Sequence, residues 1–239
     1  MFKESKAIRY IVLLFCLGAL LYSSHNLITF FIDNNRSINL TTELRENIIN
    51  DDNDIDFTSL IEKNSDTVGW ILFNNELVNY PIVQTLNNDL YLHTGFNGNI
   101  NSLGAIFMDY RNDNFRDRNT VIYGHNTPNN TMFGSLSDAL EEDFFDNEDN
   151  NFINIITPSE IMRWQIFSVY NYIAEEYYIT TTFDSDNSFE SFIDTISNRS
   201  VHNFNIDLSI YDRILTLSTC YGTGNTDWRT VIHAKLVVD

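Results

Sequence analysis

The sequence has few cysteines, prolines, glycines and basic residues. Its 239 residues include two cysteines, three prolines and nine glycines. Two cysteines cannot supply a disulfide framework, and so little proline and glycine excludes collagen-like and proline-rich architectures. Lysine and arginine total 14 against 33 aspartates and glutamates, for a formal net charge of -19. Because this charge repels the phosphates of nucleic acids, we expect no nucleic-acid partner.

Several motifs of catalysis and metal binding are also missing. The chain has no glycine-rich phosphate loop, no CxxC pair, no HExxH motif and no internal repeat. Its acidic clusters lack the ligand spacing of a calcium site. The nearest match begins at Asp184, and Phe189 stands where an EF-hand loop needs its glycine. What the chain does have is 43% hydrophobic residues, which is enough to build a folded core.

The amino terminus combines basic residues with an apolar stretch. Three basic residues within the first nine precede an apolar run over residues 10–22, and a weaker apolar stretch follows at 27–32. The first run has about 13 residues, which is shorter than the roughly 20 of a membrane-spanning helix and would also suit a signal peptide. Read on to residue 32, the segment is long enough to span and contains no A-x-A cleavage site. We therefore predict an uncleaved signal-anchor over residues 1–32, with the rest of the chain outside the cell.

A polar region separates this anchor from the main domain. Residues 33–55 are rich in Asn and Asp and carry apolar residues at helical spacing, so they are predicted to be a spacer or a peripheral helix. A short helix is expected from Asp56, a favourable N-cap, to about Asn64. Residues 56–239 are predicted to form one extracellular domain.

That domain is predicted to be mainly β. Short apolar segments broken by Asn, Asp and Gly predict eight strands, over residues 68–73, 78–83, 104–109, 120–125, 151–156, 162–170, 213–219 and 229–238. Such strands indicate a closed or nearly closed barrel, and Pro81 indicates an edge position or a bulge for its strand. Helical periodicity appears in connections at residues 88–93, 132–140 and 187–196, and Asp186 or Asn187 is the expected cap of the last.

Cys220 is the one cysteine of the predicted extracellular domain. It ends an apolar strand in the sequence LSTC and precedes a turn that contains two glycines. An unpaired thiol outside the cell is prone to oxidation, so its presence at a strand end points to a nucleophile, while a buried small hydrophobe is the alternative. A thiol with a pKa of about 8.5 is mostly protonated at neutral pH, and catalysis therefore needs a base or a cation nearby.

Two residues are suited to assist this thiol. His125 ends another apolar strand, in the sequence YGHN, and is the preferred base. The other candidates are His93, His202 and His233. Arg229 opens the strand after the Cys220 loop, so antiparallel pairing would return it to the thiol, where a guanidinium can stabilise an oxyanion without competing as a base. Taken singly, the histidine could be structural and the arginine a surface residue, but their combination with the thiol favours acyl transfer.

These motifs resemble those of the sortases, the membrane-anchored cysteine transpeptidases of Gram-positive bacteria. YGHN with His125, LSTC with Cys220 and Arg229 on the final strand occur in the family's order, and the resemblance covers residues 56–239. The FMDYRN run at 107–112, the N-terminal helices and the long helix-bearing connection before the Cys220 strand resemble class B. The resemblance implies an eight-stranded sortase-type β-barrel with N-terminal helices and a helix between strands 6 and 7. It implies no metal or organic cofactor, because thiol acyl transfer needs none.

The resemblance also implies a mechanism and its partners. Cys220 would attack the carbonyl after the threonine of a C-terminal sorting signal, and His125 would protonate the leaving amine. Arg229 and the backbone N–H of Tyr221 would stabilise the oxyanion. An amine of cell-wall peptidoglycan would then resolve the thioester, and secreted proteins with an NPxTx- or SPxTG-like motif are the expected substrates. The groove residues implied by class B are Asn88, Leu92, Tyr178, Ile179 and Ser218, with Tyr221 beside them.

One feature departs from the pattern of some class B members, which have an acidic residue directly after the cysteine. Here the residues 221–224 contain no acid, and Asp227, the nearest one, is assigned no catalytic role. Two alternatives remain. One is a sortase that polymerises pilin subunits, in which a lysine of another protein resolves the thioester. The other is a membrane-tethered binding module in which Cys220 and His125 are incidental.

Overall fold

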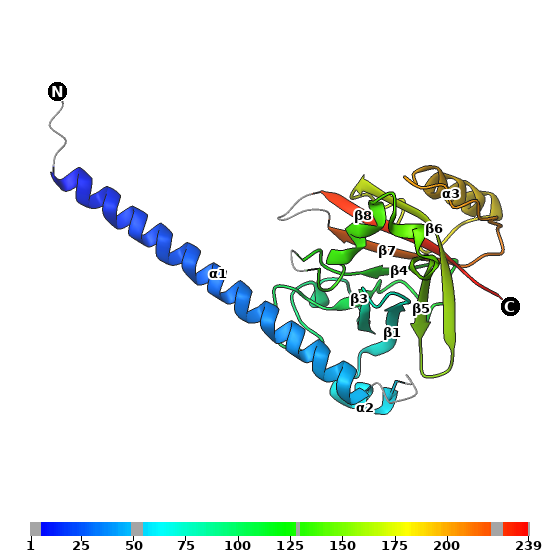
Figure 1. Cartoon of the computed structure of the whole chain (residues 1–239), viewed down its shortest axis with the longest axis horizontal. Coiled ribbons are helices and arrows are strands. Elements are labelled where there is room, and N and C mark those ends of the chain that lie inside the picture. Colours follow the sequence, from blue (N-terminus) through cyan, green and yellow to red (C-terminus); the bar gives the residue numbers. More distant parts are fainter. Residues whose placement is uncertain (1–5, 49–54, 128–129, 221–226, 239) are drawn as a thin grey trace, which may run out of the picture.

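The computed structural model describes residues 6–48, 55–127, 130–220 and 227–238, and within them a closed β-barrel stands at the end of one long helix (Figure 1). The strands are β1 (Thr67–Phe73), β2 (Asn79–Val83), β3 (Ile106–Met108), β4 (Asn119–Tyr123), β5 (Phe152–Ile156), β6 (Ile161–Ile173), β7 (Ile214–Cys220) and β8 (Trp228–Leu236). The α-helices are α1 (Lys6–Ile48), α2 (Phe57–Lys63) and α3 (Asp186–Asn198). Shorter 3-10 helices are η1 (Leu90–Leu92), η2 (Gly134–Leu140), η3 (Phe144–Asp146) and η4 (Glu148–Asn151).

The strand order around the barrel is β1-β2-β3-β4-β7-β8-β6-β5, which confirms the predicted eight-stranded barrel. Every predicted strand is found, and its ends differ from the prediction by at most three residues. The pairs β2/β3 and β4/β7 are parallel, and the other neighbours are antiparallel. Because β4 and β7 are adjacent and parallel, the residues that follow them emerge at the same end of the barrel.

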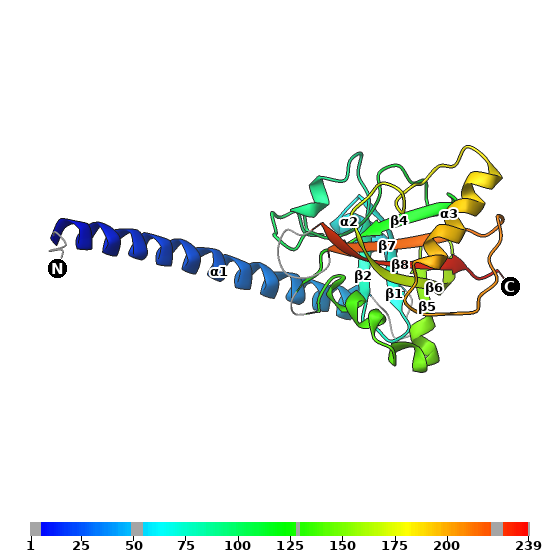
Figure 2. The ribbon, with the colours of Figure 1, turned by 90° about the horizontal axis from the view of Figure 1, so that it is seen from above.

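Alternation of side chains along the strands divides the apolar residues between the barrel interior and its outer surfaces. In β1, Ile71 and Phe73 belong to the interior cluster, whereas Trp70 packs outside with Leu60 of α2 and Leu44 of α1. A third cluster lies between α3 and the outer face of β6 and β8, and Figure 2 shows α3 over these strands. The three clusters therefore use both faces of the sheet, and α3 is the predicted helix between strands 6 and 7.

Of the two expectations for the strand of Pro81, an edge or a bulge, the edge position is wrong. Its strand, β2, lies between β1 and β3 in the closed barrel and is no edge strand. The irregularity in the β1/β2 register falls between Thr67 and Gly69, whereas Pro81 pairs regularly with Trp70. Pairing with β3 begins only at Ile82, so the missing N–H of proline interrupts no hydrogen bond on that side.

A single continuous helix, α1, begins at Lys6 and ends at Ile48, so no helix end marks the predicted boundary at residue 33. Its segment Ile8–Ile32 has a mean hydropathy of 1.8, none of it is buried in the structure, and it is long and apolar enough to cross a membrane. Figures 1 and 2 show this part projecting away from the barrel. Near the other end, Leu44 is only 1% exposed, because it packs in the outer cluster beside α2. The C-terminal part of the helix therefore packs against the barrel domain through Leu44.

The caps of the shorter helices follow local side-chain chemistry. Asp56 caps α2 by accepting a hydrogen bond from the backbone N–H of Ser59 at 3.1 Å, as predicted. For α3 the predicted cap is wrong, because Ser185 rather than Asp186 or Asn187 takes that position. Ser185 has extended backbone angles and forms a reciprocal capping box with Ser188. Asp186 lies one residue further on, in the first turn.

Candidate active site

The parallel pairing of β4 with β7 brings His125 and Cys220 to one end of the barrel. Tyr123 and Ser218 are register partners at the ends of these strands. His125 and Cys220 each follow two residues later, and the N–H of Gly124 donates to the carbonyl of Ser218 at 3.3 Å. Of Cys220 only the backbone position at the end of β7 is described, and Tyr221 lies outside the described residues.

Arg229 returns to the same place through the antiparallel pairing of β7 with β8. The register of these two strands makes Cys220 and Arg229 direct partners, as predicted from their spacing. The guanidinium of Arg229 also donates from Nη1 to the carbonyl of Trp228 at 2.9 Å.

A pocket of about 410 Å³ lies at this end of the barrel. It is bounded by the η1 region, by the connection after β6 and by the ends of β4, β7 and β8. Its lining is Asn88, Leu92, Phe107, Tyr123, Gly124, His125, Ala174, Glu175, Glu176, Tyr178, Ile179, Ser218, Thr219 and Arg229. All five groove residues implied by the class B resemblance line this one pocket together with His125 and Arg229. Their roles toward a substrate remain predictions.

Burial and one hydrogen bond set the proton state of His125. Burial is the largest influence and lowers its pKa, with smaller contributions from the nearby His93 and Arg229, while the carbonyl of Leu92 acts in the opposite direction. This side chain is therefore neutral at pH 7. Its Nε2 lies 2.9 Å from the carbonyl oxygen of Leu92, which can only accept, so the proton is on Nε2 and the lone pair is on Nδ1. Neutral His125 is therefore a proton acceptor at Nδ1.

Gly124 allows this histidine to follow directly on the barrel strand. A Cβ atom at Gly124 would lie 2.4 Å from Cδ1 of Ile106 and 2.8 Å from the ring of Phe133, closer than atoms pack. The backbone before His125 therefore rests on buried side chains, which fixes where the imidazole begins. Tyr123 and Gly124 were not selected from the sequence as site residues, although their position in YGHN was a usable signal. Phe107 begins the FMDYRN run, which was also a usable signal, whereas the lining residues 174–176 carried none.

The other histidines do not line this pocket, although His93 is near enough to influence the pKa of His125. His93 ends η1 and lines a separate shallow hollow with Asn87, Leu90 and Ile100. His202 binds the carbonyl of Ala139 at 2.8 Å. Neither lines the pocket that holds His125, so neither is placed to serve Cys220.

His233 is a structural residue of the core. It is completely buried on β8, where Nε2 lies 2.8 Å from the hydroxyl of Tyr170 and Nδ1 lies 2.8 Å from Oγ1 of Thr216. Burial, aided by the positive charge of Arg199, lowers the pKa of His233 to about 3. Both ring nitrogens are therefore engaged in a neutral imidazole, which excludes His233 as the base.

This burial predicts acid sensitivity. The unfolded chain protonates His233 below its ordinary pKa of 6.5, whereas the folded chain resists protonation down to a pKa of about 3. The contribution of neutral His233 to the free energy of unfolding is therefore fully present above pH 6.5. It falls by about 1.4 kcal/mol per pH unit as the pH is lowered from 6.5 toward 3. Between pH 6.5 and 4.5, we expect the free energy of unfolding of the wild type to fall by about 2 to 3 kcal/mol more than that of His233→Gln. Urea unfolding followed by tryptophan fluorescence measures both values. Identical losses in both proteins would contradict the buried neutral state.

The described residues contain no group of three or more His, Cys, Asp or Glu side chains that could hold a metal ion. The chemistry available at this end of the barrel is that of a thiol at the end of β7, a neutral imidazole and a guanidinium. Such a set suits nucleophilic acyl transfer, in which the thiol attacks, the imidazole moves a proton and the guanidinium stabilises the oxyanion.

Comparison with known proteins agrees with this chemistry. The family profile of the sortase domain matches residues 75–237. Sortase B of Staphylococcus aureus is 36% identical over 183 residues, covering 76% of this chain and 74% of that protein, and sortase B of Listeria monocytogenes is 39% identical over 181 residues, covering 73% and 71%. The crystal structure of sortase B from B. anthracis superposes with a TM-score of 0.77 at 34% identity, covering 87% of this chain and 100% of that chain. The chain therefore belongs to class B of the sortase family, whose members are cysteine transpeptidases.

Proposed function

We propose that this transpeptidase cleaves the C-terminal sorting signal of secreted proteins after threonine and joins them to an amine of cell-wall peptidoglycan. The observation that carries the proposal is the register of β7 with β8 and β4. It places Cys220 opposite Arg229 and brings His125 to the same end of the barrel, beside one pocket. Family membership already sets aside a non-catalytic binding module.

In the first half-reaction the sulfur of Cys220 adds to the backbone carbonyl carbon of the threonine in the sorting motif. Arg229 stabilises the resulting oxyanion, and the backbone N–H of Tyr221, outside the described residues, is the predicted second donor. His125 takes the proton of the thiol at Nδ1 and delivers it to the leaving nitrogen as the C–N bond breaks. A thioester on Cys220 and a released peptide with a free amine are the products.

In the second half-reaction an acceptor amine attacks the thioester carbonyl. The C–S bond breaks as the new amide forms, and the proton lost by the amine restores the resting thiol and imidazole pair. Water competes for the same thioester and gives hydrolysis. The acceptor distinguishes wall anchoring from pilin polymerisation, because the first uses a peptidoglycan amine and the second a lysine of another protein.

The pocket is the proposed binding site of the sorting motif. Asn88 and Leu92 enter it from the η1 side, Tyr178 and Ile179 from the connection after β6, and Ser218 from β7. Its lining combines apolar and aromatic side chains with the polar or charged side chains of Asn88, Glu175, Glu176, Ser218 and Thr219, beside His125 and Arg229. An NPxTx- or SPxTG-like motif is the proposed ligand.

The amino-terminal helix is the proposed membrane anchor. Residues 1–32 anchor the protein in the membrane of a Gram-positive cell, residues 33–55 form the connection, and residues 56–239 form the extracellular catalytic domain. The exposed apolar surface over Ile8–Ile32 supports the anchor, and the basic residues before it support an extracellular domain.

Peptide cleavage by the full-length enzyme in detergent micelles tests this function. Peptides with NPxTx, SPxTG and LPxTG motifs are compared, with and without a peptidoglycan-derived amine, and products are identified by mass spectrometry. We expect cleavage after threonine for a motif without leucine at its first position, and an amide product when the amine is present. No cleavage of any peptide by an enzyme with a reduced thiol would contradict the proposal.

A further inference from the structure

A buried carboxylate directly behind the pocket collects an unusual number of donors. Asp109 follows β3 and is completely buried. Its Oδ1 accepts from the backbone N–H of Arg111 at 2.9 Å and from Nε of Arg111 at 2.8 Å. Its Oδ2 accepts from Nη2 of Arg111 at 2.7 Å, from the hydroxyl of Tyr123 at 2.8 Å and from Nδ2 of Asn88 at 3.1 Å. Five hydrogen bonds therefore hold one carboxylate in one orientation.

This carboxylate is ionised at neutral pH. Burial raises the pKa of Asp109, but the hydrogen bonds from Arg111 and Tyr123 together with the charge of Arg111 outweigh it, so the pKa lies below its usual value. The same pairing raises the pKa of Arg111, and burial with the nearby carboxylate raises that of Tyr123. The pair is therefore a fixed carboxylate and guanidinium with a neutral phenol beside it.

Arg111 also holds the Tyr178–Ile179 segment, which lines the other side of the pocket from Asn88 and Tyr123. Its Nη2 also donates to the carbonyl of Ile179 at 2.9 Å, across 68 positions in sequence. Ile179 lies in the connection between β6 and α3. Of the two residues that donate to Asp109 and line the pocket, Asn88 lies in the connection between β2 and η1, and Tyr123 ends β4. One ion pair thus contacts three residues that line the pocket from three separate segments.

A second side chain holds the same wall. Nδ2 of Asn119, on β4, lies 2.9 Å from the carbonyl of Thr180 and 3.4 Å from that of Tyr178. Together with the bond from Arg111 to Ile179, three consecutive carbonyls of the connection are bound by side chains of β4 and of the segment between β3 and β4. These bonds hold the backbone of residues 178–180 against the barrel, and with it the side chains of Tyr178 and Ile179 that line the pocket.

We infer that Arg111, oriented by Asp109, is a positioning residue for substrate binding that sets the width of the pocket between the Tyr178–Ile179 wall and Asn88 with Tyr123. The inference rests on the proposed function, because it takes this pocket as the binding site of the sorting motif. Arg111 itself does not line the pocket, so its effect passes through the residues it holds.

Arginine is the residue that this geometry requires. Its planar guanidinium donates through Nε and Nη2 to Asp109 and through Nη2 to Ile179 at the same time. A lysine ammonium keeps the charge that balances Asp109, but it is a single point donor and cannot reproduce this fork. Arg111→Lys therefore releases the wall without leaving a buried carboxylate uncompensated.

The test compares Arg111→Lys with Arg118→Lys in the full-length enzyme in detergent. Arg118 also pairs with a carboxylate, that of Asp186 of α3, in an exposed ion pair, but it does not line the pocket and holds no residue that does. For Arg111→Lys we expect KM for the sorting peptide to rise about 10-fold, the factor for one lost charge-assisted hydrogen bond, while kcat changes less than about threefold. Arg118→Lys should leave both constants as in the wild type. The rate of alkylation of Cys220 by iodoacetamide, followed on its tryptic peptide, should be the same in all three proteins.

An unchanged KM in a folded Arg111→Lys enzyme would overturn the inference. So would a loss confined to kcat and the alkylation rate, because that would place Arg111 in the chemistry. If Arg111→Lys does not fold, the double variant Asp109→Asn/Arg111→Gln removes both charges together and should show the same rise in KM. A wild-type enzyme that cleaves no peptide refutes the proposed function and this inference together, whereas an active wild type with an unaffected variant refutes the inference alone.

Discussion

Replacing Cys220 with alanine is expected to lower the turnover of a sorting peptide by at least about 10³-fold. The sulfur forms the covalent bond to the acyl group, and neither His125 nor Arg229 can replace it in that step. The fold should persist, since a change at the end of β7 removes one small side chain. Product formation measured by liquid chromatography, together with a thermal melt, checks both statements.

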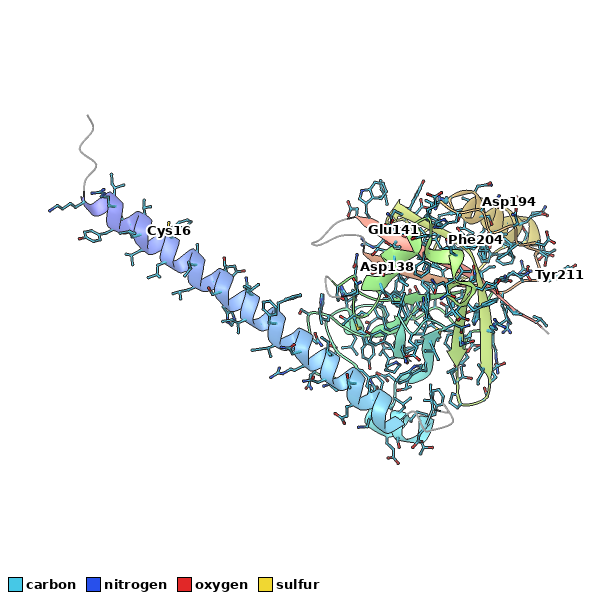
Figure 3. All side chains as sticks on the ribbon, viewed as in Figure 1. Cys16, Asp138, Glu141, Asp194, Phe204 and Tyr211 are labelled. Carbon is cyan, nitrogen blue, oxygen red and sulfur yellow. The ribbon has the colours of Figure 1, made fainter. Side chains whose placement is uncertain are left out.

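Cys16→Ala provides the matched control for this variant. Cys16 is exposed on the projecting part of α1, far from the barrel (Figure 3). The same substitution there should leave kcat/KM at the wild-type value. Turnover near the wild-type level in Cys220→Ala would remove Cys220 from the mechanism, and equal losses in both variants would point to a general effect of cysteine replacement.

Exchange of Arg229 for lysine is expected to lower kcat/KM by about 10²-fold, although the positive charge is retained. Arg229 is the register partner of Cys220 on the neighbouring strand, and it lines the pocket. Loss of one oxyanion donor costs roughly 10²- to 10³-fold in kcat, and a point ammonium on a flexible stem cannot occupy the positions of the planar fork. Steady-state cleavage of the preferred peptide gives the number.

Arg213→Lys is the control for this exchange. Arg213 directly precedes β7 and donates from Nη1 to the carbonyl of Phe115 at 3.1 Å, at the opposite end of the strand from Cys220. The same chemical change there should alter kcat/KM less than twofold. If Arg229→Lys were equally silent, oxyanion stabilisation would have to come from other groups.

Much of the barrel could be predicted from the sequence because its strands are short, apolar and separated by Asn, Asp and Gly. This local pattern located all eight strands, and the helix between strands 6 and 7 followed from its 3.6-residue periodicity. Its cap did not, because Ser185, Asp186 and Asn187 are all acceptable caps by residue type. Only the extended backbone of Ser185 and its reciprocal bonds with Ser188 select among them.

Pro81 shows where a local rule failed. Proline disfavours the interior of a sheet because it lacks an N–H, and this argument predicted an edge position or a bulge for its strand. In the barrel, β2 has a neighbour on each side, but β3 is short and its pairing starts one residue after Pro81. The rule about hydrogen bonds holds, and the position of the strand depends on where its neighbour begins.

The sequence by itself determined the chemistry and the class of fold. A single thiol at a strand end, a histidine at another and an arginine opening the last strand define an acyl-transfer set, and strand periodicity defines a barrel. Only the tertiary structure decided which segments meet. The parallel pairing of β4 with β7, the register of Cys220 with Arg229 and the bonds from Arg111 to Asp109 and Ile179 each join particular residues in particular alignments. Residue types and local periodicity do not contain these alignments, because they arise from the way the whole sheet closes and buries its two faces.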